Sequence, residues 1–454
     1  MSVQTSLNFR ANATKAIADT ALRAAMRNAA DTFGTRRLNA ISTLSDFDAL
    51  REKASAIRME VLDNIKTYME QFSNSAKSVG STVHVAEDAA AARAIIAGIL
   101  KNRNAKTITK SKSMMTEEIH LNGYLMNEGF DVIETDLGEY IIQLDSETPS
   151  HIIVPAIHKN RQQIARLFAD KLGVAYSEDP QILTKIARNI LREKFLQADA
   201  GLTGANFAIA KSGSLVIVTN EGNGRMVTTI PPLHIAVLSI DKILPSFNEL
   251  STFLRILTRS ATGQTISTYI SIITGIRKYG DRTGAKELHI VLVDNGRSRI
   301  IASDCKEMLK CIKCGACMNV CPVYRTIGGH AYGAVYPGPM GIILTTLLLG
   351  MKNSHPLIDA STLCGACNEV CPVKIPLMEL IIKQRTRRVS EGYSPLPLSV
   401  GMRFFKIASR MPSLFSLGER LASIFWPVIK IVGGEKILGR IPRPSRIPFR
   451  RRTT

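Results

Sequence analysis

The chain has 454 residues, of which 45% are hydrophobic and 21% are charged, and its formal net charge is +20. This composition is typical of a folded globular protein, and the length predicts two or three domains. Membrane-spanning and secreted proteins are not indicated, because no run approaches the roughly 18 apolar residues that span a bilayer and the N-terminus shows no apolar signal core. The lack of both features, together with the clustered reduced thiols, favours a cytoplasmic location.

The positive charge is concentrated at one end of the chain. Residues 381–454 carry sixteen Lys and Arg residues against three acids, so +13 of the +20 lies there. Charge confined to a tail favours an anionic membrane surface or an acidic protein partner over nucleic acid. We therefore expect no nucleic-acid binding, and peripheral attachment to the inner face of a membrane stays open as an alternative to a purely cytoplasmic location.

Residues 1–79 are predicted to be a helical segment that packs on the rest of the protein. Apolar residues recur at three- and four-residue spacing within 44–72, which predicts one long amphipathic helix there. From residue 80 to 297, short β-rich runs alternate with helical stretches, which predicts an α/β domain with a largely parallel sheet. The expected strands are Thr82–Ala86, Thr107–Lys110, Asp131–Glu134, Ile152–Pro155, Phe207–Ala210, Leu215–Thr219, Ile235–Ile240 and His289–Asp294, and the expected helices are Ala89–Leu100, Glu117–Gly129 and Asn160–Ala169.

Polar and glycine-rich turns accompany several of these strands. We expect loops at Gly201–Asn206 and Asn220–Arg225, and a further polar stretch follows the predicted strand that ends at Lys110. Ligands of α/β folds bind at the carboxyl ends of parallel strands, and lysine, serine and asparagine suit a small carboxylate or phosphate. Tight turns that need Gly and Asn for positive φ explain the same residues equally well. The candidate small-anion site consists of Lys110, Ser111, Asn206, Asn220, Glu221 and Asn223.

Seven of the eight cysteines lie between residues 311 and 372. The first run reads Cys311-Ile-Lys-Cys314-Gly-Ala-Cys317-Met-Asn-Val-Cys321-Pro322, and the second reads Ser361-Thr-Leu-Cys364-Gly-Ala-Cys367-Asn-Glu-Val-Cys371-Pro372. The first run has the spacing of bacterial ferredoxins, in which three close thiolates hold one [4Fe–4S] cluster and the fourth ligates the other cluster. This crossing assigns cluster 1 to Cys311, Cys314, Cys317 and Cys371, and cluster 2 to Cys321, Cys364 and Cys367.

The second run differs from the first at its opening position. Ser361 stands where the first run has Cys311, so cluster 2 has three thiolates and an unassigned fourth ligand. Cys305 lies outside both runs and is interpreted as a buried thiol, with a weaker alternative role as the missing ligand. Zinc also uses paired C-x2-C spacing, but closed zinc sites lack the crossed order. A disulfide framework is not expected in a long chain without a signal peptide.

The iron–sulfur module is predicted to span residues 298–390, with a helix at Pro376–Arg388. A basic C-terminal region follows from 391 to 454. It contains two predicted amphipathic helices, Met402–Arg410 and Leu414–Phe425, and an end rich in proline and arginine, Arg440–Arg452, that is expected to be extended. The predicted fold class is therefore an α/β domain, then a helical two-cluster ferredoxin module, then a basic helical and extended tail.

Several segments resemble the lactate-utilisation protein B family, the iron–sulfur subunits of a bacterial L-lactate oxidation system. They are Lys110-Ser-Lys-Ser-Met, Glu134-Thr-Asp-Leu-Gly-Glu-Tyr, Pro149-Ser-His-Ile-Ile-Val-Pro-Ala-Ile-His158, Asn220-Glu-Gly-Asn223, Asp294-Asn-Gly-Arg297 and both cysteine runs. The resemblance covers nearly the whole chain. It implies a lactate-utilisation domain similar in fold to sugar-phosphate isomerases and CoA-transferases, two clusters on the seven cysteines, and a serine at position 361. It also implies two partners, a cysteine-rich heterodisulfide-reductase-like subunit and a smaller lactate-utilisation-domain protein.

Two functions stay open at this stage. The first is an electron-transfer subunit of a multi-subunit system that oxidises L-lactate to pyruvate, in which this chain is non-catalytic or co-catalytic. The second is a small-anion-binding regulatory protein that responds to redox state without carrying electrons. No catalytic residue is assigned, because no nucleophile–base pair can be identified and neither a P-loop nor a G-x-G-x-x-G motif is present.

Overall fold

The computed structural model describes residues 6–428, which form two compact units that divide between Arg387 and Arg388. The first unit contains the α/β part together with the cysteine-rich module. The second contains the described part of the basic region. The predicted domain boundaries after residues 79 and 297 both fall inside the first unit.

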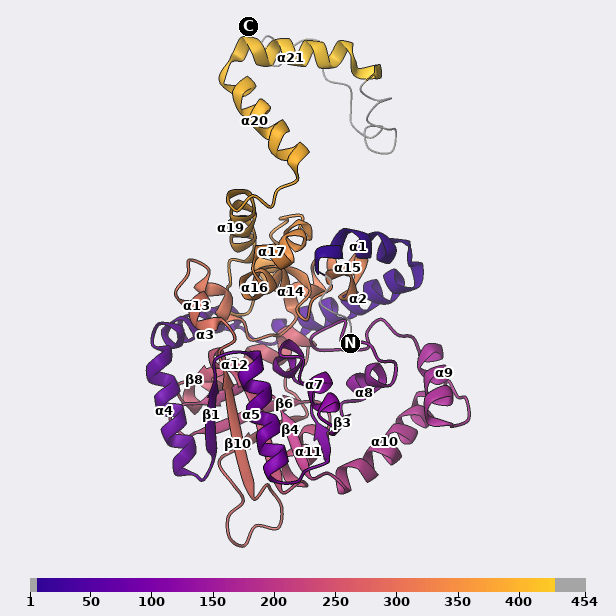
Figure 1. The fold of residues 1–454 in the computed structure, drawn as a ribbon, viewed down its shortest axis with the longest axis vertical. Helices are drawn as coiled ribbons and strands as arrows, with labels where there is room; N and C mark the ends of the chain where they lie inside the picture. Colours follow the sequence, from indigo (N-terminus) through magenta and orange to yellow (C-terminus); the bar gives the residue numbers. More distant parts are fainter. Residues whose placement is uncertain (1–5, 429–454) are drawn as a thin grey trace. The chain divides into compact units, whose positions relative to one another are not determined.

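A six-stranded sheet forms the centre of the α/β part (Figure 1). Each pair of neighbouring strands runs parallel. In spatial order the strands are β1 (Thr82–Ala86), β10 (Glu287–Val293), β7 (Leu233–Ser239), β4 (Ala200–Thr203), β2 (Thr107–Lys110) and β3 (Asp131–Glu134). The predicted α/β class with a largely parallel sheet is therefore confirmed.

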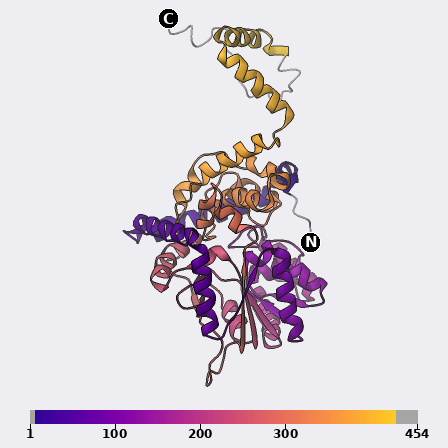
Figure 2. The same ribbon diagram turned by 60° about the vertical axis from the view of Figure 1, so that its left-hand side comes forward.

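Helices cover both faces of this sheet, which Figure 2 shows nearly edge-on. In chain order, the helices of the α/β part are α3 (Phe47–Asp63), α4 (Ile65–Ser78), α5 (Ala89–Asn102), α6 (Met114–Glu118), α7 (Leu121–Asn127), α8 (Leu137–Leu144), α9 (Arg161–Leu172), α10 (Pro180–Leu196), α11 (Asn223–Thr229), η2 (Ile240–Lys242), α12 (Phe247–Ala261) and α13 (Arg297–Ile301). Ile235 and Val237 of β7 pack with α5 and α7 on one face, whereas Ala236 and Leu238 pack with α4 on the other. Burial on both faces explains why β7 is continuously apolar.

A smaller mixed sheet connects the α/β part to the module. Its order is β8 (Ile243–Leu244), β5 (Phe207–Ile209), β6 (Ser214–Thr219) and β9 (Tyr269–Ile273). Strand β6 pairs antiparallel with β5 and β9, while β5 and β8 run parallel. Phe207, Ile209 and Val216 belong to the same buried core as the cysteines. The two parts of the first unit therefore share one hydrophobic core.

Short helices make up the cysteine-rich module, which lies over one end of the sheet in both Figure 1 and Figure 2. They are η3 (Lys306–Lys310), α14 (Ala316–Asn319), α15 (Tyr324–Ile327), η4 (His330–Tyr332), α16 (Gly338–Leu349), α17 (Met351–Ser354), η5 (His355–Asp359), α18 (Ala366–Val370) and α19 (Leu377–Ser390). The N-terminal elements η1 (Ser6–Asn8), α1 (Phe9–Ala18) and α2 (Thr20–Ser42) pack against this module. Ser6 Oγ, for example, donates a hydrogen bond to the carbonyl oxygen of Gly333 at 3.0 Å.

Two predicted elements are wrong. Residues 152–155 form bends and turns. The amides of Ile153 and Val154 donate to His151 Nδ1, so they are not available to a strand ladder. The glycine-rich stretch that begins at Gly201 was expected to be a loop, but it starts as the central strand β4. A Cβ on Gly201 would lie 2.0 Å from the carbonyl oxygen of Val227, so this strand needs glycine for close approach to α11.

Two predicted helices are each broken in the middle. The helix expected over residues 44–72 consists of α3 and α4, which meet at Asn64. The helix expected over Glu117–Gly129 consists of α6 and α7, which are separated by His120 in the left-handed conformation, with a φ of 51°. The strands expected at 82–86, 107–110 and 131–134 are confirmed with the same bounds.

The second unit contains α20 (Leu396–Arg410) and α21 (Pro412–Ile424), which confirm the two helices expected there, each with an earlier start. The rings of Phe405 and Phe415 lie 6.1 Å apart and hold the two helices together. The predicted extended end, Arg440–Arg452, lies outside the described residues. Among residues 6–428, the structure has no helix that is both long and apolar enough to cross a bilayer.

Candidate functional site

The first group of thiols consists of three cysteines from the first run and one from the second. Cys311, Cys314, Cys317 and Cys371 line one small cavity in the module. Burial raises the pKa of Cys314 to about 12, and the neighbouring Cys311 and Cys371 contribute to this shift. The pKa of Cys317 is raised well above its usual value by burial and by the other three thiols. Buried thiols gathered this closely call for a cation to stabilise their thiolates.

The second group of thiols combines one cysteine of the first run with two cysteines of the second run. Burial raises the pKa of Cys367 to about 12, with contributions from Cys321 of the first run and Cys364 of its own run. Cys321 and Cys367 are buried, whereas Cys364 is exposed. One cavity thus brings Cys371 of the second run to three cysteines of the first run, and Cys321 of the first run lies near Cys364 and Cys367.

The two runs have the same backbone conformation around their cysteines. Lys313 and Leu363 occupy equivalent positions and have φ angles of 58° and 55°, and the glycine two residues later has a φ of 79° in the first run and 81° in the second. The short helices α14 and α18 begin directly after these glycines. The amide of Lys313 donates to Cys311 Sγ at 3.4 Å, and that of Ile375 donates to Cys371 Sγ at 3.3 Å. Amide donors of this kind stabilise thiolates that ligate an iron–sulfur cluster.

The spacing of the sulfurs fits a cluster better than a single zinc ion. A tetrahedral zinc site with Zn–S distances of about 2.3 Å would hold its sulfurs roughly 3.8 Å apart. Within residues 6–428, no three cysteine sulfurs lie within 4.8 Å of one another. The cysteines surround a space wider than one zinc ion, as an iron–sulfur cluster requires.

Ser361 keeps the local geometry of a cysteine position. Its Oγ accepts a hydrogen bond from the amide of Leu363 at 3.2 Å, and its carbonyl oxygen accepts one from Arg385 at 2.8 Å. Cys305 does not line the small cavity of the first group of thiols. It is buried, accepts a hydrogen bond from Gln384 Nε2 at 3.3 Å, and has a pKa raised chiefly by burial.

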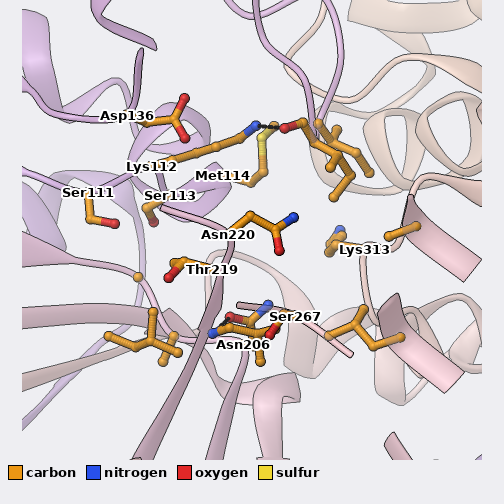
Figure 3. A pocket seen from close by; sticks show the side chains of 18 of the residues that line it. Ser111, Lys112, Ser113, Met114, Asp136, Asn206, Thr219, Asn220, Ser267 and Lys313 are labelled. Carbon is orange, nitrogen blue, oxygen red and sulfur yellow. Dashed lines mark hydrogen bonds between the residues drawn. The ribbon is translucent and has the colours of Figure 1, made fainter. Parts of the chain in front are cut away.

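A larger cavity of about 440 Å³ lies at the carboxyl ends of the parallel strands, next to the first run of cysteines (Figure 3). Loops after β2, β4, β6 and β7 form its floor, and Ile312, Lys313 and Tyr336 of the module close it from the other side. In Figure 3, Lys112 and Asp136 lie on one side of the cavity and Lys313 on the other, with Asn220 between them.

Five of the six residues of the candidate small-anion site line this cavity: Ser111, Asn206, Asn220, Glu221 and Asn223. Lys110 does not. Its ammonium group is fully buried and forms ion pairs with Glu134 and with Glu117, the latter at 3.2 Å. As the last residue of β2, Lys110 is thus neutralised inside the α/β part, and it is not available to a ligand in the cavity.

Three lysines that line the cavity, Lys112, Lys242 and Lys313, are absent from the predicted site. Lys112 donates to the carbonyl oxygen of Ile153 and lies 4.0 Å from Glu139. The pKa of Lys242 is lowered to about 8, chiefly by burial, and Lys313 contributes to this shift as a neighbouring positive charge.

The sequence could have identified two of these lysines as residues of the site, but not the third. Lys112 and Lys242 each follow a strand that the sequence predicts, so their place at the strand ends could have identified them. Lys313 belongs to the first cysteine run, and only tertiary packing brings it to the cavity.

At the other end of the cavity lies a glutamate, Glu221, whose carboxyl group has a raised pKa. The pKa of Glu221 is raised to about 7, chiefly by burial and then by the neighbouring Asp136. Its carboxylate accepts a hydrogen bond from the amide of Leu137 at 3.3 Å. The cavity thus has an acidic end near α8 and a basic end near the first cysteine run.

A buried polar network joins the α/β part to the module beside this basic end. Arg297 donates to both carboxylate oxygens of Glu118, at 2.8 and 2.7 Å, and to Asp241 at 2.7 Å. The hydroxyl of Tyr336, which comes from the module, donates to the same Glu118 at 2.6 Å. The network fixes Tyr336, and with it one wall of the cavity.

Comparison with known proteins finds two families in this chain. Residues 69–293 match the LUD domain family, and residues 307–375 match the 4Fe-4S dicluster domain family. Lactate utilization protein B of Bacillus velezensis is 46% identical over 416 residues, which cover 91% of this chain and 87% of that protein. Its counterpart in Bacillus subtilis is 44% identical with the same coverage of both chains. An Escherichia coli protein described as "Uncharacterized electron transport protein YkgF" is 43% identical over 92% of this chain and 88% of its own length.

Proposed function

Because the chain belongs to the lactate utilization protein B family, we propose that it is an iron–sulfur electron-transfer subunit of a multi-subunit system that oxidises L-lactate to pyruvate. The main observation in support of this proposal is that two cavities share lining residues. Ile152, Ile312 and Lys313 line both the 440 Å³ cavity of the α/β part and the small cavity of the first cysteine group. A molecule bound in the larger cavity is therefore one layer of side chains away from cluster 1.

We assign two [4Fe–4S] clusters to the seven cysteines. Cluster 1 is held by Cys311, Cys314, Cys317 and Cys371, and cluster 2 by Cys321, Cys364 and Cys367. Such clusters supply one-electron transfer when they are bound. The chain's own contribution is to bury the thiolates and to donate amide hydrogen bonds to their sulfurs, which tunes the reduction potential.

Electron transfer suits the chemistry of lactate oxidation. Conversion of L-lactate to pyruvate releases two electrons and two protons, so a chain of one-electron carriers has to remove the electrons singly. The Escherichia coli relative is described as an electron transport protein, which supports this role. We further propose that the chain acts with a cysteine-rich heterodisulfide-reductase-like subunit and a smaller lactate-utilisation-domain protein.

The basic region, residues 391–454, is proposed to contact an anionic membrane surface or an acidic partner. Exposed apolar side chains on α20 and α21, among them Phe404, Ile407 and Leu421, support a surface-binding role. Deletion of residues 440–454 should reduce the fraction of the protein that sediments with membranes or with its partners. Unchanged sedimentation would contradict this role of the terminal arginines.

Growth on L-lactate tests the electron-transfer proposal. A strain that carries Cys314→Ala should lose the absorbance of cluster 1 and growth on L-lactate, while growth on glucose continues. The matched control is Cys305→Ala, because Cys305 is a buried thiol outside both groups. Growth of the Cys314→Ala strain on L-lactate after loss of cluster 1 would contradict the electron-carrying role and favour a redox-responsive small-anion-binding protein.

A further inference from the structure

Two histidines and a glutamate come together between a loop of the α/β part and the module. Glu147 and His158 belong to the loop between α8 and α9, and His330 begins η4 of the module. One possible ligand atom from each of these residues lies within 4.8 Å of the other two. The ring centres of His158 and His330 are 4.5 Å apart. Tertiary packing thus gathers imidazole and carboxylate groups, which are ligand types of zinc and related divalent ions.

The hydrogen bonds of the two imidazoles determine which nitrogen of each ring carries the proton. His158 Nε2 lies 2.7 Å from Glu147 Oε2, and His330 Nε2 lies 2.7 Å from the carbonyl oxygen of Thr148. An ionised carboxylate and a carbonyl oxygen can only accept, so each Nε2 donates. In the neutral ring the lone pair then lies on Nδ1, and this is the form of histidine that binds a metal ion.

Nδ1 of His158 is a buried atom without a partner. The side chain of His158 is 11% exposed, and its Nδ1 forms no hydrogen bond within the part of the chain that the structure describes. A buried polar atom that lacks a partner lowers stability, so such an atom calls for an explanation. A metal ion on Nδ1 would supply the partner and would keep the bond from Nε2 to Glu147. Metal-bound histidines usually have a carboxylate or carbonyl oxygen on their second nitrogen in this way.

The charges around these histidines favour a cation. Lys159 forms ion pairs with Glu147, at 3.0 Å, and with Asp145. Two carboxylates therefore share one ammonium group, and one negative charge is left over while both imidazoles are neutral. A divalent cation within a few Å of these carboxylates would be attracted to this excess charge.

We propose that His158 and His330 bind one divalent transition-metal ion of the zinc type through their imidazole nitrogens, with Glu147 as the carboxylate that balances its charge. None of these three residues lines the large cavity or the small cavity of the first cysteine group. The metal site is therefore distinct from both, and it goes beyond the proposed electron-transfer function.

The metal would link a loop of the α/β part to the module. This loop already contacts the module through Tyr324, whose hydroxyl donates to the carbonyl oxygen of Ser150 at 2.8 Å. Residues 152–155 of the loop line the large cavity. Ser150 precedes these residues in the chain and His158 follows them, so a bond between His158, the metal and His330 would hold this wall of the cavity at its second end.

The alternative is that the same residues form only a hydrogen-bond network that holds the loop without a metal. That interpretation leaves the buried Nδ1 of His158 unexplained. A second histidine pair provides a matched comparison. His84 Nε2 and His289 Nδ1 lie 3.0 Å apart, but among residues 6–428 they do not belong to a group of three ligand atoms within 4.8 Å of one another.

The zinc content of the cluster-loaded full chain tests the proposal directly. The protein is prepared anaerobically, equilibrated with zinc, passed over a chelating resin and analysed for zinc and iron. We expect about one zinc ion per chain with unchanged iron, and a zinc X-ray absorption spectrum that shows nitrogen and oxygen ligands without sulfur. A zinc content near zero would overturn the proposal. Sulfur ligands would also overturn it, because they would place the zinc on cysteines.

Matched variants then locate the site. His158→Gln and His330→Gln each remove a ligand, and Glu147→Gln removes the carboxylate that accepts from His158. Each should weaken zinc binding about tenfold or more, since even loss of the outer carboxylate of a metal site has an effect of this size. Zinc should also raise the Tm of the wild type but not that of His330→Gln, because a ligand that binds only the folded chain stabilises it. His84→Gln is the control and should bind zinc as the wild type does.

Two outcomes of the variant series would overturn the metal site. One is zinc affinity that neither His158→Gln nor His330→Gln lowers. The other is an equal loss of affinity in His84→Gln, which would show adventitious binding to surface histidines. The iron content of each variant reports whether its module still folds. If a variant loses its iron, the X-ray absorption spectrum of the wild type still decides between histidine and cysteine ligands.

Discussion

Cys311 and Ser361 accept the same hydrogen bond at equivalent positions of the two cysteine runs. The amide of Lys313 donates to Cys311 Sγ at 3.4 Å, and the amide of Leu363 donates to Ser361 Oγ at 3.2 Å. The serine therefore preserves the turn that presents the following cysteines, although it supplies no thiolate. Under the proposed assignment, cluster 2 has one sulfur ligand fewer than cluster 1 but the same local turn.

Replacement of Ser361 by alanine should leave the iron content of the protein unchanged. The change removes one partly exposed hydrogen bond, so we expect a loss of about 1 kcal/mol in the free energy of unfolding. Iron and sulfide analysis of anaerobically prepared wild type and Ser361→Ala checks this. Loss of about one iron per chain in the variant would contradict it and would make Ser361 Oγ a ligand of cluster 2.

A pair of glycine substitutions tests the packing of the central strand. In Gly201→Ala the new Cβ would lie 2.0 Å from the carbonyl oxygen of Val227, so α11 has to move away from β4. We expect a loss of stability of about 3 kcal/mol or more, since overpacking against backbone cannot be relieved by a rotamer change. Gly98→Ala in α5 is the control, because no atom lies within 4 Å of its new Cβ. That change should stabilise the protein by up to about 1 kcal/mol through helix propensity. Equal thermal stability of the two variants would contradict this assignment of β4.

Removal of Arg297 should weaken the junction between the module and the α/β part. Arg297→Met leaves Glu118 and Asp241, whose side chains are 6% and 3% exposed, without their shared cation. Breaking a buried ion pair in this way costs about 3–5 kcal/mol. Arg103→Met is the control, since Arg103 pairs with Glu287 at the surface and such pairs contribute about 1 kcal/mol or less. Chemical denaturation under anaerobic conditions compares the two, and similar losses of stability would be inconsistent with the network.

Burial of His234 should make the protein less stable in mild acid. Burial lowers the pKa of His234 from 6.5 to about 4, while its Nε2 is hydrogen-bonded to Thr203 Oγ1 at 2.8 Å. Between these two values the unfolded chain binds a proton that the folded chain does not, so the free energy of unfolding falls as the pH falls from 6.5 towards 4. The contribution of this residue reaches about 3 kcal/mol at the acidic end. In His234→Gln this part of the pH dependence should disappear. The same slope in variant and wild type would show that other groups cause it.

The sequence predicted elements well where apolar runs are bounded by turns, as for β1, β2 and β3. The predictions were wrong where a segment packs against a part of the protein that its own sequence pattern does not reveal. In the loop formed by residues 152–155, Ile152 is buried and Ile153 partly buried against the module, and periodicity cannot distinguish this from a strand. Strand β4 was missed because its sequence, Ala-Gly-Leu-Thr, contains a glycine that only the approach of Val227 explains.

The candidate site was predictable in the same partial way. Residues that follow the strands, such as Ser111 and Asn220, could be placed at one edge of the sheet from the α/β pattern, and they line the cavity. Lys110 was wrongly included, because Glu134 becomes its neighbour only when β2 and β3 pair, and Glu117 only when α6 packs against the end of β2. Lys313 was missed because it comes from the module, and only tertiary packing brings the module onto the sheet.

The crossed arrangement of the clusters is tested most directly by the reduced-state electron paramagnetic resonance spectra of four variants: Cys314→Ala, Cys321→Ala, Cys367→Ala and Cys371→Ala. Cys314 and Cys367 define the spectral loss of cluster 1 and cluster 2 respectively, since each belongs to its group under either arrangement. We predict that Cys371→Ala loses the same signal as Cys314→Ala, and that Cys321→Ala loses the same signal as Cys367→Ala. A Cys371→Ala spectrum that matches Cys367→Ala would contradict the crossed ligation.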